Sequence, residues 1–439
     1  MRTALLALLV LPASLIAACG DNDIPAPADT APPAPVQNDP RFAIDGARHF
    51  YLVGNDLTPG QDELTIHVTA PAGTAYVDAW IDGNPGVRLD DDGAGGFALT
   101  ADIGGLAAGD HAVLLAADSA PTAFARVPFV RTHPLYFMMT TDWDFSDPTA
   151  VSTDFMDQLH DDHPSLLITH FVGPYTFTDP AVSDAREAEL VSWIKAQRDD
   201  HGDEIGLHIH PYCNFVEYAG LTCNIDDSTV YSTDATGYTV QVAAYGDADF
   251  RTLLETADQL FMERGLGKPI TFRAGGWTAS IETMRALAAT GYVADTSANN
   301  WARMEEWDTP RGGTLYDWNM EHWASIGDTS QPYYPNQDDI LADTAPTLDI
   351  LEVPDNAIMV DYVSVDEMVE IFDENWDGVS GLTRPTSYMM GFHPSDRFTA
   401  DEQDRVDGMV SHVEDYLAVD GNGPVVFALL RDMPQVWRR

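Results

Sequence analysis

Reactive side chains recur directly after apolar stretches in this chain. The stretch EIGLHIHPY, residues 204–212, places two histidines two positions apart. Because side chains at i and i+2 of an extended chain point the same way, His208 and His210 would share one face of a strand. Two such imidazoles can hold a metal ion, form a catalytic pair, or be core histidines that alternate by chance. Further candidates follow other apolar stretches: Asp142 and Asp144 in TTDWD, Arg273 in FRAGGW, Asp295 in ADTS and His393 in GFHPSD.

The elements that must position these residues are short apolar segments alternating with amphipathic ones. The candidate strands are 135–140, 165–171, 204–209, 270–273, 292–295, 347–352, 387–392 and 425–430. Asp184 with Glu187, and Thr399 with Glu402, have the spacing of capping boxes that open two of the intervening helices. Seven or eight β/α units in succession predict a barrel of parallel strands, with a doubly wound open sheet as the competing architecture.

The reactive residues share one position, the carboxyl ends of the predicted strands. Barrel enzymes build their active sites on this face. Any one of these side chains could be structural, since a buried histidine or aspartate is commonly just hydrogen-bonded in place. Because five strand ends agree, we expect an enzymatic site at this face.

The order of four motifs resembles a known family. LLITHFVGP, HGDEIGLHIHP, FRAGGW and MGFHPSD follow one another between about residue 133 and the end of the sequence, and together they resemble the polysaccharide deacetylase (NodB homology) superfamily. The resemblance implies an irregular barrel of seven or eight β/α units. It also implies a hydrolase that removes N-acetyl groups from a polysaccharide of the peptidoglycan or exopolysaccharide N-acetylglucosamine type.

The first motif of that family, T-F-D-D-G, supplies a catalytic base and a metal-binding aspartate. Here the matching segment is TTDWD, so Asp142 matches the base and Trp143 stands where the metal ligand is expected. Either Asp144 supplies the metal-binding oxygen, or Asp142 serves both roles. The resemblance also matches Arg273 to the arginine that holds the base, and His393 to the histidine that acts as general acid.

The second motif also departs from the family pattern, which has two histidines four positions apart. His208 matches the first, but Tyr212 occupies the position of the second. We therefore assign His210 as the replacement, since it can share a face with His208. Two imidazoles and a carboxylate with open positions for water and substrate are the usual catalytic arrangement for zinc, so we expect a divalent metal, and zinc in particular.

The expected chemistry is hydrolysis of an acetamide. Asp142 would take a proton from the attacking water, and His393 would protonate the departing amine. We assign Trp143, Tyr212, Trp277 and Asp295 to substrate contact, because aromatic rings in loops at this face can stack on sugars, although such rings can equally be loop core.

Two other functions fit the same motifs. The altered first and second motifs could mark a lipoprotein that binds glycan without hydrolysing it. A His-x-His pair at a strand end also resembles metal-dependent amidohydrolases, but its place after two other β/α units counts against that class.

The segments before residue 132 indicate export and a second domain. Residues 1–18 have the charge and short apolar run of a signal peptide, and IAAC resembles the bacterial lipobox, in which the cysteine, here Cys19, is lipidated. Residues 19–40 are rich in Pro, Ala and Asp and predict a disordered tether. Short alternating segments with Gly and Asp turns over 41–131 predict an Ig-like β-sandwich, leaving 132–439 for the barrel.

Composition and cysteine use limit the environment and the partners. In an exported chain the two remaining cysteines, Cys213 and Cys223, suggest a disulfide. The balance of 22 Lys and Arg against 70 Asp and Glu, a net charge of −48, argues against nucleic acid or an anionic membrane surface as a partner. We therefore expect a membrane-anchored lipoprotein of the bacterial cell envelope whose partners are its lipid anchor and a polysaccharide; the sequence identifies no protein partner.

Overall fold

A computed structural model describes residues 26–91, 96–144, 151–225, 235–307, 313–395 and 398–438. The described residues form two compact units, one made of 26–44, 67–99 and 113–127 and the other of 45–66, 100–112 and 128–438. The predicted signal peptide and Cys19 lie outside the described residues. Within the described residues, none of the helices combines the length and apolar character that a membrane span requires.

The N-terminal region is all-β, as predicted. One sheet has the strand order β1-β3-β6 and the other the order β2-β8-β7-β4-β5. Exposed and buried side chains alternate along β3, which is the pattern of a strand with one face in a core. The Ig-like class and the limits 41–131 stay predictions. The strands are β1 (Ala43–Asp45), β2 (Phe50–Leu52), β3 (Glu63–Thr69), β4 (Tyr76–Ile81), β5 (Val87–Asp90), β6 (Gly96–Asp102), β7 (Gly109–Ala117) and β8 (Phe124–Thr132).

The described end of the predicted tether is bound at two points. The indole Nε1 of Trp80 donates to the carbonyl oxygen of Ala28 (2.8 Å), and the backbone N–H of Asp39 donates to the carbonyl oxygen of Phe124 (2.9 Å). Residues 26–40 therefore have defined partners in the all-β region.

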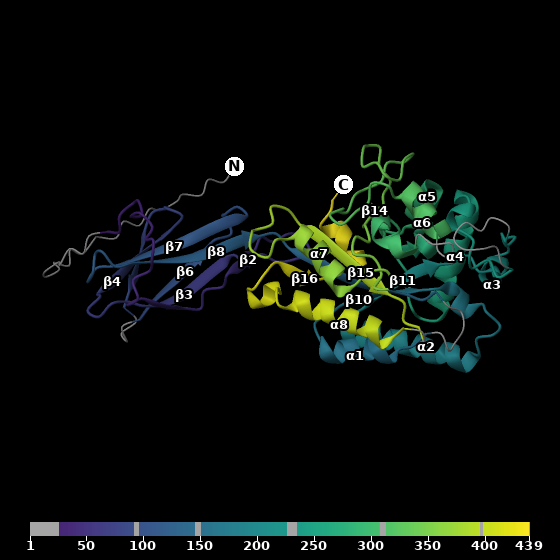
Figure 1. Ribbon diagram of the computed structural model, residues 1–439, viewed down its shortest axis with the longest axis horizontal. Helices are drawn as coiled ribbons and strands as arrows, with labels where there is room; N and C mark the ends of the chain where they lie inside the picture. Colours follow the sequence, from purple (N-terminus) through teal and green to yellow (C-terminus); the bar gives the residue numbers. More distant parts are fainter. Residues whose placement is uncertain are drawn as a thin grey trace, which may run out of the picture. The chain divides into compact units, whose positions relative to one another are not determined.

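The chain after residue 132 contains one parallel sheet, to which every strand predicted in that region contributes (Figure 1). Its order is β14-β13-β12-β11-β10-β9-β15, with β16 also paired to β9. Strand β9 is buried along its whole length, as expected for parallel strands covered on both faces. The strands are β9 (Leu135–Asp142), β10 (Ile168–Val172), β11 (Glu204–Ile209), β12 (Thr271–Ala274), β13 (Ala294–Asp295), β14 (Leu351–Glu352), β15 (Thr386–Phe392) and β16 (Val425–Phe427).

The strands are arranged as an irregular barrel. Successive strands are added on one side of β9 and the late strand β15 lies on its other side, an order that a barrel and a doubly wound sheet can share. The segment after β14 separates the two architectures, because it closes the gap between β14 and β15. After β14 the chain runs beside β15: Ala357 N–H donates to the Met389 carbonyl oxygen (2.9 Å), and Val360 N–H donates to that of Gly391 (3.0 Å). The predicted α/β barrel is confirmed, and the competing open sheet is not observed.

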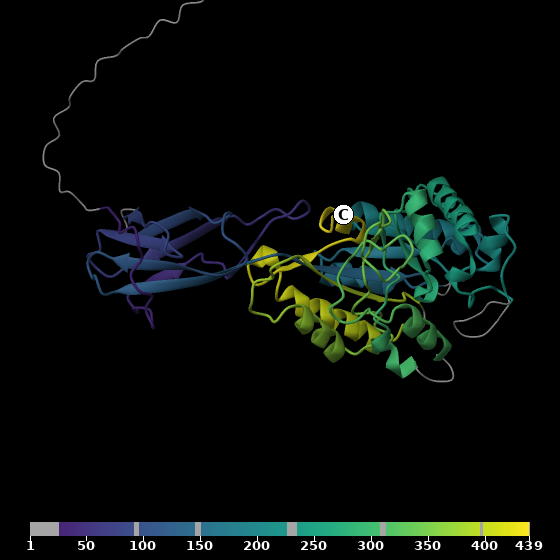
Figure 2. The same ribbon diagram turned by 90° about the horizontal axis from the view of Figure 1, so that it is seen from above.

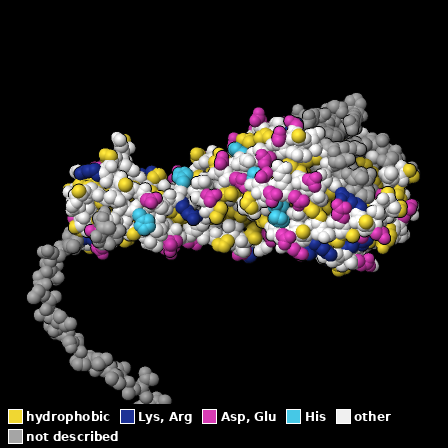
Figure 3. All heavy atoms as spheres, turned by 90° about the horizontal axis from the view of Figure 1, so that it is seen from below, with side chains coloured by type: hydrophobic (Ala, Val, Ile, Leu, Met, Phe, Trp, Pro, Cys, Tyr) yellow, Lys and Arg dark blue, Asp and Glu magenta, His cyan; other side chains and the backbone are white. Residues whose placement is uncertain are grey.

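Helices surround the strands of this sheet, with α4 and α5 on one side and α7 and α8 on the other in Figure 2. Carboxylates are scattered over the face shown in Figure 3, where Lys and Arg are few, as the net charge of −48 requires. The helices are α1 (Asp154–Asp162), α2 (Asp184–Ala196), α3 (Cys213–Tyr218), α4 (Asp247–Glu263), α5 (Ile281–Thr290), α6 (Gly313–His322), α7 (Val365–Asn375) and α8 (Ala400–Glu414).

The helix starts confirm one predicted cap and correct the other. Thr399 and Glu402 form the predicted capping box at the start of α8. Helix α2 begins at Asp184, but its N-cap is Ser183, whose hydroxyl accepts the backbone N–H of Arg186. The prediction placed the cap one residue late, because Ser and Asp are about equally good N-caps and spacing alone does not separate them.

A glycine in β11 makes room for the aromatic ring that supports Arg273. A Cβ on Gly206 would lie 2.7 Å from Cδ1 of Phe171 and 3.0 Å from Oγ1 of Thr271. Phe171 is fully buried, and the guanidinium carbon of Arg273 lies 5.0 Å from the centre of its ring. The space at Gly206 is thus part of what positions this arginine.

We predict opposite effects for two glycine-to-alanine changes. Gly206→Ala should lower the free energy of unfolding by about 1–3 kcal/mol, because it overpacks the contact with Phe171. Gly408→Ala is the control: it lies inside α8 with only ordinary contacts to Val365, so it should raise stability by about 0.5–1 kcal/mol through helix propensity. Urea unfolding measures both, and a neutral or stabilising Gly206→Ala would contradict this account.

Candidate active site

Six predicted site residues from four strand ends come together at the carboxyl edge of the parallel sheet. The strand register sets His208 of β11 beside Arg273 of β12. Asp142 is the last residue of β9, where the register sets it beside Phe171 of β10. Asp142 Oδ1 accepts a hydrogen bond from Arg273 Nη1 (3.0 Å), and its Oδ2 lies 4.0 Å from His208 Nδ1. His393, which follows β15, completes the cluster through Asp144.

Asp144 is the centre of three imidazoles. Its Oδ1 lies 2.9 Å from His208 Nε2 and 3.3 Å from His210 Nε2, and its Oδ2 lies 3.5 Å from His393 Nε2. Burial opposes ionisation of this carboxyl, but the three histidines hold the pKa of Asp144 well below its usual range. The site therefore favours a carboxylate at this position.

The donor atoms of three side chains fit a metal ion. His208 Nδ1 lies 2.9 Å from the Arg273 carbonyl oxygen, and His210 Nδ1 lies 3.2 Å from the Tyr238 carbonyl oxygen. A carbonyl oxygen only accepts, so each Nδ1 carries a proton and each ring turns its Nε2 toward the Asp144 carboxylate.

A deprotonated Nε2 offers a lone pair, so a cation placed between such nitrogens and the Asp144 carboxylate would be bound by all three side chains. The Nε2 of His210 is buried and has no hydrogen-bond partner among the described residues. Donor atoms of Asp144, His208 and His210 lie within 4.8 Å of one another, and backbone carbonyls orient both rings in the way that is usual for metal-binding histidines. These residues fit a divalent metal held by two nitrogens and one oxygen.

Arg273 joins the cluster to a carboxylate that the sequence did not single out. The guanidinium is fully buried, with Nη2 3.2 Å from Asp355 Oδ2 and Nη1 2.8 Å from Thr140 Oγ1. Asp355 follows β14 and also accepts the indole N–H of Trp277 (3.0 Å). Burial raises the pKa of Asp355 to about 6, although Arg273 acts in the opposite direction.

A second unpredicted carboxylate orients His393. Its Nδ1 lies 2.9 Å from Asp361 Oδ2, in the segment beside β15. Burial alone would lower the pKa of His393, but Asp361 and then Asp144 raise it to about 10. Asp361 therefore stabilises the protonated imidazole and sets the direction in which Nε2 points.

Three of the four residues assigned to substrate contact are enclosed in the protein. Trp143 is 1% exposed and packs in the core, Trp277 is 4% exposed with its indole N–H on Asp355, and Asp295 is fully buried. Asp295 accepts hydrogen bonds from Ser297 and adjoins Glu352, whose pKa burial and the Asp295 carboxyl together raise well above its usual range. These three side chains are enclosed by protein contacts, and their assignment to substrate contact stays a prediction.

Tyr212 is partly exposed and lies at the cluster, where its hydroxyl donates to the backbone carbonyl oxygen of Asp144 (3.1 Å). Cys213 and Cys223 form the predicted disulfide just after it.

The sequence contains a signal for one of the three site residues that were not predicted, and none for the other two. Asp355 follows a strand end, so the rule that found the other residues applies to it. Asp361 and Tyr238 lie in irregular segments, and nothing in the local sequence indicates that they contact His393 and His210.

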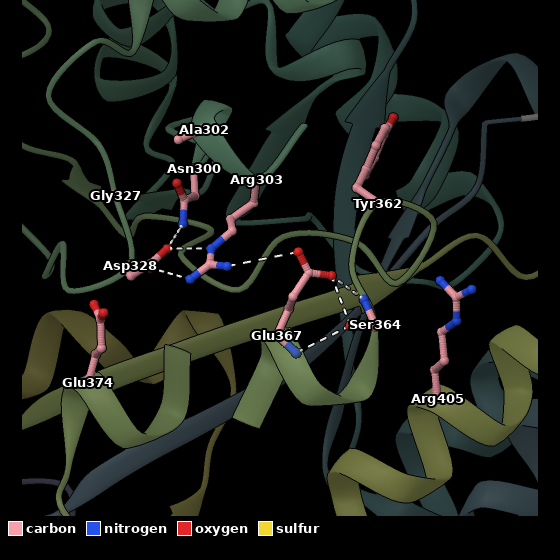
Figure 4. A pocket seen from close by; sticks show the side chains of 10 residues that line it. All are labelled: Asn300, Ala302, Arg303, Gly327, Asp328, Tyr362, Ser364, Glu367, Glu374 and Arg405. Carbon is pink, nitrogen blue, oxygen red and sulfur yellow. Dashed lines mark hydrogen bonds and ion pairs between the residues drawn. The ribbon is translucent and has the colours of Figure 1, made fainter. Parts of the chain in front are cut away.

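A separate cavity of about 720 Å³ lies beside the segment that carries Asp361 (Figure 4). Its charged side chains pair mainly with each other or with nearby backbone. Arg303 contacts Asp328 at 2.6 Å, and Arg405 donates to the carbonyl oxygens of Val360 and Val363. The residues lining it are Asn300, Ala302, Arg303, Gly327, Asp328, Tyr362, Ser364, Glu367, Glu374 and Arg405.

Comparison with known proteins finds remote structural likenesses. No family model and no curated protein matches the chain. A Mycobacterium smegmatis protein assigned as a polysaccharide deacetylase is 13% identical, with a TM-score of 0.41 over 68% of this chain and 88% of its own. The family 4 carbohydrate esterase from Streptomyces lividans in complex with acetate is 13% identical, with a TM-score of 0.33 over 67% and 92%.

A third structure, a Parabacteroides distasonis protein assigned as a glycoside hydrolase/deacetylase, is 10% identical, with a TM-score of 0.43 over 70% of this chain and 72% of its own. These structures fall in the group that the motifs resemble. At such TM-scores the likeness carries no conclusion about chemistry, which rests on the side chains of this chain.

We predict that Asp355 makes stability depend on pH. Its folded pKa of about 6 is raised above the unfolded value near 4, so its contribution is fully present below pH 4 and is lost as the pH rises through 6. Between pH 4 and pH 8 the wild type should lose roughly 1.5–3 kcal/mol of unfolding free energy relative to Asp355→Asn. Urea unfolding at several pH values measures this difference, and a constant difference would contradict the prediction.

Proposed function

We propose that this protein is a metal-dependent hydrolase that removes N-acetyl groups from a polysaccharide of the cell envelope, of the peptidoglycan or exopolysaccharide N-acetylglucosamine type. The observation that carries the proposal is the Asp144 carboxylate, faced by the Nε2 atoms of His208 and His210. A second carboxylate, Asp142, and a third imidazole, His393, flank that group and are each fixed by a charged partner.

The chain supplies a base and an acid for amide hydrolysis. Asp142, held by Arg273, takes the proton from the attacking water, and His393, held by Asp361, gives a proton to the nitrogen that leaves as an amine when the C–N bond breaks. Asp144, His208 and His210 would hold the metal, with zinc as the proposed ion. When bound, zinc supplies Lewis acidity to water and to a carbonyl oxygen.

The proposed location follows from the sequence. A signal peptide ending at a lipidated Cys19 would place the enzyme in the bacterial cell envelope, anchored by lipid and acting on a polysaccharide there. The disulfide between Cys213 and Cys223 is consistent with an oxidising compartment.

We predict that His208 and His210 are needed to bind the metal, whereas Asp142 is needed only for the chemical step. His208→Ala and His210→Ala should lose zinc measured by elemental analysis, together with acetate release from acetylated chito-oligosaccharides. Asp142→Asn should keep about one zinc per chain and lose acetate release by two orders of magnitude or more. His322→Ala, whose Nδ1 bonds only within α6, is the control and should retain both.

Two results would count against the proposal in different ways. Zinc retained by both histidine variants would contradict the ligand assignment. Zinc bound by the wild type without acetate release would favour a glycan-binding protein that does not hydrolyse its ligand.

We also predict that Asp361 sets the alkaline limit of activity. His393 must be protonated to act as an acid, and Asp361 raises its pKa. Removing that charge in Asp361→Asn should lower the pKa, so the alkaline limb of the kcat/KM profile should move to lower pH by about one unit or more. A profile of reduced height but unchanged position would show that Asp361 does not act through His393.

A further inference from the structure

We infer that three tyrosines, Tyr175, Tyr212 and Tyr238, hold the metal-binding carboxylate and one metal-binding imidazole in place, and that the Cys213–Cys223 disulfide fixes the loop that carries Tyr238. We call these three residues the tyrosine clamp. The inference rests on the metal centre of the proposed function. It adds Tyr175 and Tyr238, which neither the motifs nor the strand-end rule indicate, and gives Tyr212 a positioning role.

Asp144 lies beyond the last backbone hydrogen bond between β9 and its neighbour. Strand β9 ends at Asp142, and Trp143 N–H donates the last backbone hydrogen bond to the neighbouring strand, at the carbonyl oxygen of Phe171 (3.0 Å). Sheet pairing therefore places Asp142 directly, but it does not reach the carboxylate two residues later. Asp144 needs other contacts to keep its oxygens facing the histidines.

The tyrosine clamp supplies those contacts with three hydroxyl groups. Tyr175 donates to the carbonyl oxygen of Trp143, and Tyr212 donates to the carbonyl oxygen of Asp144 (3.1 Å). Tyr238 donates to the carboxylate oxygen Oδ2 of Asp144 (3.1 Å). Two hydroxyls thus hold the backbone and the third holds the side chain, which leaves Oδ1 toward the two imidazoles.

Tyr238 also determines the orientation of His210. Its carbonyl oxygen lies 3.2 Å from His210 Nδ1, and its ring stacks on the imidazole with centroids 4.4 Å apart and an interplanar angle of 28°. The imidazole also packs against Gly275, where a Cβ would come within 2.6 Å of the ring. A tyrosine and a glycine therefore both contact the imidazole, whose Nε2 lies 3.3 Å from Asp144 Oδ1.

The disulfide fixes the loop that carries Tyr238. The backbone N–H of Cys213 donates to the carbonyl oxygen of Thr236 (2.7 Å). Gly237 packs so closely that a Cβ would lie 3.0 Å and 3.2 Å from the two sulfur atoms and 2.5 Å from the Pro211 carbonyl oxygen. Thr236 and Gly237 thus pack against the disulfide immediately before Tyr238, which contacts two of the three proposed metal ligands, Asp144 and His210.

The test is the zinc affinity of the metal-free full chain, measured by competition titration. Tyr238→Phe removes one hydroxyl and keeps the ring and the carbonyl, and Cys213→Ser/Cys223→Ser releases the loop. Because partners that orient metal ligands typically change affinity by 10–100-fold when removed, each change should weaken zinc binding by about that factor. Acetate release by Tyr238→Phe should recover when zinc is raised above the weakened Kd, which a loss of catalytic function would not show.

Matched variants separate the clamp from general destabilisation. Tyr218→Phe changes an exposed tyrosine at the last position of α3, the helix that begins with Cys213, and should leave zinc affinity unchanged. Gly237→Ala and Gly220→Ala both force a side chain onto a left-handed backbone, at φ +77° and +79°, but a Cβ at Gly220 meets nothing. Only Gly237→Ala should weaken zinc binding.

The outcomes distinguish failure of the clamp from failure of the metal centre. If the wild type binds zinc, and Tyr238→Phe and the double cysteine variant bind it with the same affinity, the clamp alone is overturned. No zinc binding by wild type overturns the metal centre and the clamp together. Equal weakening in Gly237→Ala and Gly220→Ala would show that backbone strain, and not the disulfide contact, controls the loop.

Discussion

The buried guanidinium of Arg273 is the interaction on which the rest of the candidate site depends. A charge removed from water is tolerated only when it is paired and hydrogen-bonded, and here Asp142 and Asp355 lie on either side of it. Asp142 is the last residue of β9, while Asp355 begins the irregular segment that runs beside β15. The ion cluster that positions the candidate base therefore joins β9 to the part of the barrel that lacks regular strands.

The proposed metal ligands are held in two ways, by the sheet and by contacts from loops. His208 lies within the sheet, where register places it beside Arg273, whereas Asp144 and His210 follow the ends of their strands. Side-chain hydroxyls and carbonyls from other segments replace the missing ladder hydrogen bonds. The position of His208 thus depends on the sheet, and the positions of Asp144 and His210 depend on the surrounding loops. We therefore expect the disulfide in those loops to affect metal affinity.

The sequence predicts the position of a site residue when that position follows from the strand next to it, and not when it depends on partners far away in the chain. Period and composition located all eight strands of the parallel sheet, and the strand-end rule then gathered Asp142, His208, Arg273 and His393 at one edge. Trp143 packs in the core, whereas Asp142 and Asp144 on either side of it face the site, and composition does not tell which of the three does which. Asp361 and Tyr238 have no local pattern, because their partners are reached only through folding.

The sequence by itself determined which strands form, that they run parallel, and which edge of the sheet carries the reactive groups, because side-chain period and connection length are local properties of the chain. Tertiary structure alone decided which atoms face one another: that carbonyls turn the Nε2 atoms of His208 and His210 toward Asp144, and that tyrosine hydroxyls keep Asp144 in place. Those contacts join segments up to 94 residues apart. Their existence depends on packing, which no single stretch of the chain specifies.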